Sequence, residues 1–190
     1  MSNTGTIILV AIVFLVIGGL LAMAVSRFQR SKRLKEHFGS EYERAIDEVG
    51  DKRKAEEELQ ARLDHVEKLN IRALTPEETD RFTREWQATQ TEFVDHPHAS
   101  VQKANDLIKE VMSTRGYPVD DFEQRAADIS VNHPDLVTNY RELHAIAAKN
   151  NRDGISTEEM RQAMVHGRAL FHELVQPETT VEDTTEKEKV

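Results

Sequence analysis

The chain has 190 residues, of which 31% are charged, with a formal net charge of −9 and no cysteine. Its length allows at most one small folded domain with appendages, and the lack of cysteine excludes disulfides, thiolate metal sites and a cysteine nucleophile. An acidic chain is repelled by nucleic-acid phosphates, so we expect no nucleic-acid partner.

After a short tail of residues 1–5, residues 6–25 read TIILVAIVFLVIGGLLAMAV and contain no charged side chain. At ~1.5 Å per helical residue this stretch spans the ~30 Å hydrocarbon core of a bilayer, which predicts a transmembrane helix. A cleaved signal peptide is the alternative, because Ala22-Met23-Ala24 has the small-x-small form, but no Lys or Arg precedes the stretch. Gly18 and Ala22 would let two such helices pack closely, which predicts a weak homodimer.

Five basic residues follow the apolar stretch before the first acidic residue, in a juxtamembrane segment of residues 26–40. We call them the basic collar: Arg27, Arg30, Lys32, Arg33 and Lys35. We expect the collar to hold anionic headgroups of the lipid bilayer, at ~1 kcal/mol per charge. The positive-inside rule then places the amino terminus outside and the remaining chain in the cytoplasm, with a periplasmic-facing domain as the alternative. Apolar residues between the charges leave a helix lying at the interface as an alternative to a plain stop-transfer collar.

Residues 41–73 predict a helical stalk. Ser40 followed by Glu43 has the form of a capping box, and apolar residues at helical spacing come after it. Gly50 weakens this helix by ~1 kcal/mol relative to alanine. If it is straight from Glu41 to Asn70, it is ~45 Å long at ~1.5 Å per residue.

Residues 74–176 predict a small α-helical bundle. Thr75-Pro76-Glu77-Glu78 is a clear helix start, with Thr at the N-cap and Pro at the first helical position. Five apolar stripes at helical spacing follow, the last beginning at Ser156 with Glu159 as its capping box. No window alternates β-branched residues with period two, so the predicted fold class is all-α. Residues 177–190 are rich in Glu and Thr and predict a disordered acidic tail.

The sequence offers few groups that could carry chemistry. The loop from Lys149 to Gly154 fails as an EF-hand, because Lys149 stands where an acid is needed and Met160 where the bidentate Glu is needed. There is no HExxH motif, P-loop or nucleophile elbow. We therefore expect no catalytic residue, cofactor or metal. A site between bundle helices, assembled from histidines and a carboxylate, keeps a metal-dependent or hydrolytic enzyme as the alternative: His144, His166, and Glu142 or Asp128.

Most apolar and aromatic residues of these stripes are expected in the core. Trp86 and Phe93 form the one large aromatic pair that could instead serve a protein partner.

Three blocks carry a resemblance: FGSEYERAI (38–46), LTPEETDRFTREWQATQTEFVDHPHASVQKANDLIKEVMSTRGYP (74–118) and DFEQRAADISVNHPDLVTNYRELH (121–144). They resemble a group of uncharacterised bacterial single-pass membrane proteins. The resemblance implies the same layout and a bacterial inner (cytoplasmic) membrane, with no activity, cofactor or catalytic residue to carry over. We expect a membrane-anchored, non-enzymatic interaction, adaptor or structural module with a protein partner. A membrane or envelope stress sensor is a further alternative.

Overall fold

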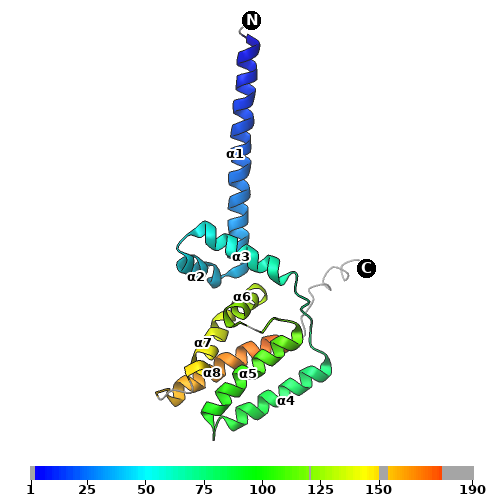
Figure 1. The fold of residues 1–190 in the computed structure, drawn as a ribbon, viewed down its shortest axis with the longest axis vertical. Helices are drawn as coiled ribbons and strands as arrows, with labels where there is room; N and C mark the ends of the chain where they lie inside the picture. Colours follow the sequence, from blue (N-terminus) through cyan, green and yellow to red (C-terminus); the bar gives the residue numbers. More distant parts are fainter. Residues whose placement is uncertain (1–2, 120, 150–153, 177–190) are drawn as a thin grey trace, which may run out of the picture. The chain divides into compact units, whose positions relative to one another are not determined.

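The computed structural model describes the backbone of residues 3–119, 121–149 and 154–176, and side chains from Phe14 onward within these ranges. The described chain forms eight α-helices and contains no strand, so the predicted all-α class is confirmed (Figure 1). The helices belong to two compact units, residues 1–61 and residues 62–190, which are described separately. The predicted acidic tail of residues 177–190 lies outside the described residues, as does most of the loop after Lys149.

The first unit holds α1 (Asn3–Phe38), α2 (Ser40–Val49) and most of α3 (Lys52–Val66). Helix α1 has 36 residues and runs without interruption from the apolar stretch through the basic collar (Figure 1). Within the described residues, none of the helices combines the length and the apolar character needed to cross a membrane. Residues 6–13, where the predicted transmembrane segment begins, lie outside the described side chains.

Two glycines set the turns of this unit, and both correct predictions from the sequence. Gly39 is the N-cap of α2 with a φ of 52°, and no side chain caps this helix, so the predicted capping box of Ser40 is wrong. Gly50 ends α2 in the left-handed conformation, with a φ of 69°. Because a left-handed C-cap ends a helix, the straight stalk from Glu41 to Asn70 is wrong as well.

The first unit buries a small set of apolar side chains, taken from the end of α1, from α2 and from the first turns of α3. They are Leu34, Phe38, Tyr42, Ala45, Ala55 and Leu59. Helices α1 and α2 pack against each other. The carboxyl-terminal part of α1 therefore belongs to the packed core of this unit and also continues the helix of the apolar stretch.

The second unit is the predicted bundle. Its helices are α4 (Pro76–Glu92), α5 (Pro97–Arg115), α6 (Phe122–Asn132), α7 (Val137–Lys149) and α8 (Thr157–Val175). Helix α8 packs on α4, α5 and α7 around one apolar core (Figure 1). The predicted N-cap at Thr75 and the predicted capping box of Ser156 with Glu159 are confirmed, and the structure shows that Thr75 also forms a capping box with Glu78.

Candidate functional site

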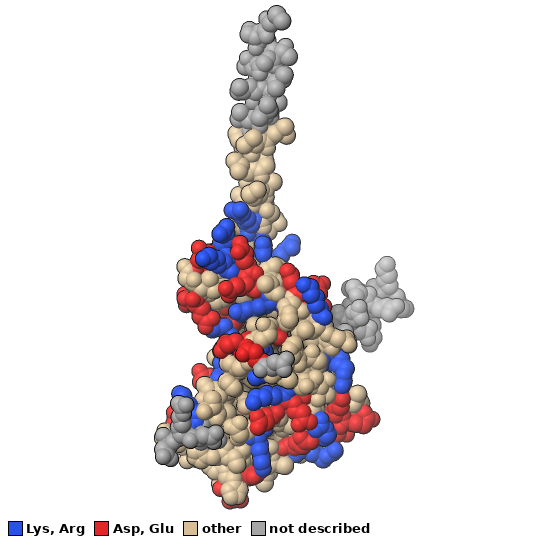
Figure 2. All heavy atoms as spheres, in the orientation of Figure 1, with Lys and Arg blue, Asp and Glu red and all other residues tan. Residues whose placement is uncertain are grey.

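The described part of α1 above the basic collar presents apolar side chains to its surroundings. Large apolar residues between positions 14 and 25 are between 48% and 76% exposed. They are Phe14, Leu15, Val16, Ile17, Leu20, Leu21, Met23 and Val25. In Figure 2 this part of the helix is a tan rod without red or blue atoms, and blue side chains begin directly below it. Such a surface is far larger than the scattered apolar residues of an ordinary protein surface.

The five residues of the basic collar fall into two groups. Lys32 lies 3.7 Å from the carboxylate of Glu36, and Lys35 donates to Glu43 over 2.6 Å. The bond to Glu43 raises the pKa of Lys35. Three arginines of the collar have no ion-pair partner among the described residues: Arg27, Arg30 and Arg33. The collar therefore keeps three arginines without a direct ion-pair partner among the described residues, directly after the apolar surface.

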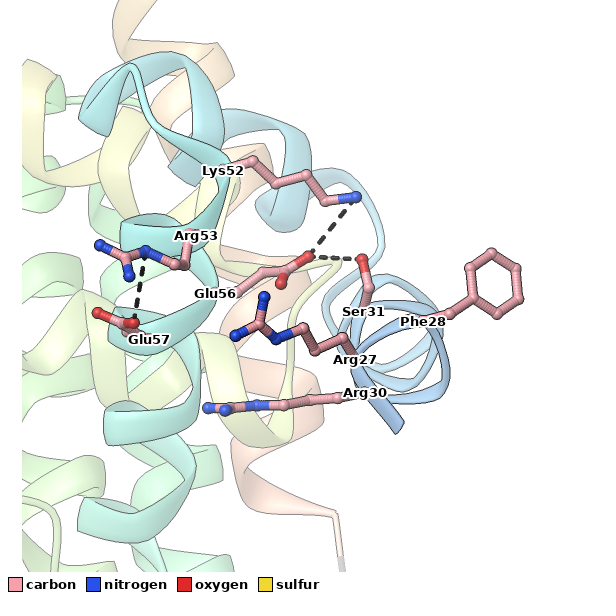
Figure 3. Close-up of a pocket in the computed structure, with 8 residues that line it drawn as sticks. All are labelled: Arg27, Phe28, Arg30, Ser31, Lys52, Arg53, Glu56 and Glu57. Carbon is pink, nitrogen blue, oxygen red and sulfur yellow. Dashed lines mark hydrogen bonds and ion pairs between the residues drawn. The ribbon is translucent and has the colours of Figure 1, made fainter. Parts of the chain in front are cut away.

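Two of these arginines line a hollow between α1 and α3, with a volume of about 490 Å³ (Figure 3). The hollow is lined from α1 by Arg27, Phe28, Arg30 and Ser31, and from α3 by Lys52, Arg53, Glu56 and Glu57. Figure 3 shows Arg27 and Arg30 reaching from α1 toward α3, whereas the ring of Phe28 points away. Phe28 is 72% exposed, so an apolar ring stands beside the charged hollow.

Glu56 connects the three helices of the first unit. Its Oε1 accepts hydrogen bonds from Ser31 Oγ at 2.5 Å and from Tyr42 Oη at 2.7 Å, and Lys52 Nζ lies 3.7 Å away. Burial by itself would raise the pKa of Glu56, but the two hydroxyl donors and the nearby cations outweigh burial and lower it. The carboxylate is therefore ionised near neutral pH and engaged by protein donors.

Sequence reasoning singled out Arg27 and Arg30 as part of the basic collar, but it predicted neither the hollow nor its α3 residues. Lys52 and Glu56 occupy positions where a coiled-coil seam would carry apolar residues. That departure was the available signal, because a polar pair on an otherwise apolar stripe often has a polar partner across the packing. The sequence alone did not show that the partner would be Ser31 of α1.

The two histidines of the alternative metal or hydrolytic site have different partners in the bundle. His144 stacks on the ring of Phe122 at 3.8 Å, and His166 Nδ1 lies 3.0 Å from Asn139 Oδ1. Burial, with the charges of Lys109 and Arg125, lowers the pKa of His144. In the part of the chain that the structure describes, no three His, Asp or Glu side chains are placed to hold a metal ion.

Asp128 is the buried carboxylate of the bundle. It is fully buried, accepts a hydrogen bond from Gln124 Nε2 at 2.8 Å and lies 3.7 Å from His65 Nε2. Its second oxygen has no hydrogen-bond partner among the described residues. Burial raises its pKa, and the Gln124 donor and the charges of His65 and Arg62 only partly oppose this effect. A buried carboxylate with one unsatisfied oxygen is a cost to folding when it is ionised.

The two aromatic residues considered for a partner surface differ in how deeply they are buried. Trp86 is 5% exposed and stacks on Phe171 with ring centroids 4.7 Å apart, so it belongs to the core. Phe93 is half-buried and lines a hollow of about 140 Å³ with Met164 and Val165. A helical stripe does not distinguish a core face from a partner face, which is why Trp86 was misplaced.

Comparison with known proteins adds no constraint to this picture. No protein-family model, curated protein or solved structure matches the chain. The proposed function therefore depends on the exposed apolar surface of α1 and on the hollow between α1 and α3.

Proposed function

We propose that this chain is a membrane-anchored, non-enzymatic helical module, which holds its bundle at a lipid surface as an interaction, adaptor or structural protein. One observation carries the proposal: the exposed apolar surface of α1 leads directly into the unpaired arginines of the basic collar. An apolar stretch that is followed by a basic cluster is typical of a membrane anchor with its cytoplasmic flank.

The apolar surface favours lipid over a protein partner because it covers every side of the helix. Phe14, Leu15, Val16 and Ile17 are consecutive, and successive residues of an α-helix point about 100° apart. All four are exposed, so no single face is reserved for a packing partner. A helix that is apolar all round needs an apolar environment on all sides, which a bilayer supplies.

The orientation in this proposal places the amino terminus outside and the bundle in the cytoplasm of a bacterial inner membrane. The basic residues lie on the carboxyl-terminal flank of the apolar stretch, and no Lys or Arg lies on the other flank. Cytoplasmic flanks carry the excess of Lys and Arg in single-pass proteins. The resemblance to bacterial single-pass membrane proteins supports the same setting.

Alkaline carbonate extraction of bacterial membranes tests the anchor. We expect the full chain to stay in the membrane pellet, and I17D/L21D to shift to the soluble fraction by at least tenfold, because each Asp costs about 2.5–3.5 kcal/mol at the centre of a membrane helix. The control is V94D, since Val94 is an exposed aliphatic residue of the second unit, at 82%. V94D should remain in the pellet. Extraction of the unaltered chain, or an unchanged I17D/L21D, would contradict the proposal.

A further inference from the structure

We propose that the hollow between α1 and α3 is a binding site for the phosphate of an anionic lipid headgroup, of the phosphatidylglycerol type. Arg27 and Arg30 line the hollow from α1, and Lys52 and Arg53 line it from α3; in Figure 3 Lys52 reaches toward α1, whereas Arg53 turns toward Glu57. The inference rests on the proposed membrane anchor and adds to it a defined ligand and two residues outside the basic collar.

The depth of the hollow along α1 matches the headgroup layer. Arg27 and Ser31 come two and six residues after Val25, the last residue of the apolar stretch. At ~1.5 Å per residue they lie ~3–9 Å below the edge of the hydrocarbon core. The headgroup layer on each side of a bilayer is roughly 5–8 Å thick. The α1 wall of the hollow therefore lies where lipid phosphates are found.

The charges of the hollow favour an anion. Four cations and two carboxylates line it, which leaves two net positive charges. Arg27 and Arg30 have no ion-pair partner among the described residues, and their guanidinium groups can form paired hydrogen bonds with a phosphate. The carboxylate of Glu56 already accepts hydrogen bonds from Ser31 and Tyr42, and the nearby charge of Arg30 stabilises it without a direct ion pair.

The α3 cations are held loosely enough to exchange partners. Lys52 lies 3.7 Å from Glu56, and Arg53 lies 3.9 Å from Glu57. Charge-assisted hydrogen bonds with good geometry are about 2.7–2.9 Å long, so both ion pairs are long. A phosphate entering between the helices can attract both side chains without breaking a short bond.

The surroundings of the hollow favour a lipid over free phosphate. Its volume of about 490 Å³ exceeds what one phosphate needs and suits a headgroup with its glycerol. The exposed ring of Phe28 points away from α3, so it does not occupy the hollow.

Calorimetric titration of the full chain in neutral detergent micelles tests the site with three probes: dioctanoyl phosphatidylglycerol, dioctanoyl phosphatidylcholine and inorganic phosphate. We expect the phosphatidylglycerol probe to bind at least tenfold more tightly than either of the others. K52E/R53E should weaken its binding by at least tenfold, because it turns the α3 wall acidic. The matched control is K54E: Lys54 is exposed on the same helix but does not line the hollow.

Each result either supports or overturns the inference. Equal binding of the two lipids would overturn it, as would phosphate binding as tightly as the anionic lipid or an unchanged K52E/R53E. The neutral variant K52Q/R53Q, with far-UV circular dichroism as the fold control, replaces K52E/R53E if the latter does not fold. Carbonate extraction separates this inference from the anchor. K52E/R53E should stay in the membrane pellet, whereas failure of the anchor would release the unaltered chain.

Discussion

At the scale of the residue, one buried carboxylate makes the stability of the second unit depend on pH. Asp128 is fully buried, with one oxygen bonded to Gln124 and the other without a partner among the described residues. Burial raises its pKa above the ordinary value of 3.8, so the folded state binds this proton more tightly than the unfolded state does. Its contribution to stability is complete below that ordinary value and is lost as the pH rises through the raised pKa of the folded state.

The variant D128N should show this effect directly. The amide oxygen of Asn can still accept from Gln124, while the desolvated charge is gone. We expect D128N to have the higher free energy of unfolding at pH 7, and this advantage to shrink as the pH falls below the pKa of the folded carboxyl. Urea denaturation of the full chain between pH 3.5 and 7.5 measures it. E142Q is the control at an exposed carboxylate, and an advantage that does not change with pH would contradict the argument.

At the scale of elements, the ends of helices show which local signals could be read from the sequence. The capping boxes of α4 and α8 are formed by residues three positions apart; the N-cap Thr75 of α4 and the whole box of Ser156 with Glu159 at α8 were predicted correctly. The start of α2 was predicted wrongly, because Gly39 takes the N-cap position and leaves Ser40 inside the helix. A capping box depends only on the local chain, whereas a glycine turn depends on the packing that the turn permits.

Longer contacts at helix ends could not be predicted from sequence patterns. Where α5 ends, the Arg115 side chain is buried and its Nε donates to the carbonyl of Arg72 over 3.1 Å. The backbone N–H of Arg72 in turn donates to the carbonyl of Arg115 over 2.8 Å. Arg115 Nη1 also donates to the carbonyl of Leu174 over 3.2 Å, so this buried arginine joins two distant segments, although in the sequence it is an ordinary last-turn cation.

Gly116 directly follows Arg115, and substitution of this glycine tests the packing between the end of α5 and the segment around Arg72. Its φ is 98°, and a Cβ at this position would lie 2.5 Å from the carbonyl oxygen of Asn70. We expect G116A to lower the free energy of unfolding by about 2 kcal/mol or more, from backbone strain and from this clash. Gly154 also has a positive φ, of 123°, but nothing within 4 Å of its Cβ position. G154A should therefore cost clearly less in the same thermal or urea denaturation, and equal losses would show that the clash is absent.

At the scale of the whole molecule, the type and order of the segments were predicted better than the turns that connect the helices. An apolar helix, a basic collar and a five-helix bundle follow in the expected order. The straight helix considered for the stalk was wrong, because Gly50 in the left-handed conformation divides this segment into two helices. The α1–α3 hollow exists only because of that division, since α3 contributes half of its lining. A pattern along one continuous helix could not have predicted the contact between Glu56 and Ser31.

The orientation of the anchor is the property on which every partner hypothesis depends. We expect a cytoplasmic reporter fused after Val190 to be active in intact cells and a periplasmic reporter at the same position to be at least tenfold less active. The change R30E/K32E/R33E removes the positive flank, so it should exchange the activities of the two reporters or abolish insertion. K54E/K68E/R84E reverses as many charges beyond the roughly 15–20 residues over which flanking charge acts, and it should leave the orientation unchanged. A periplasmic signal from the unaltered chain would refute the orientation and direct the search for partners to the envelope. It would also move the α1–α3 hollow to the outer leaflet, where the anionic-lipid experiment would still apply.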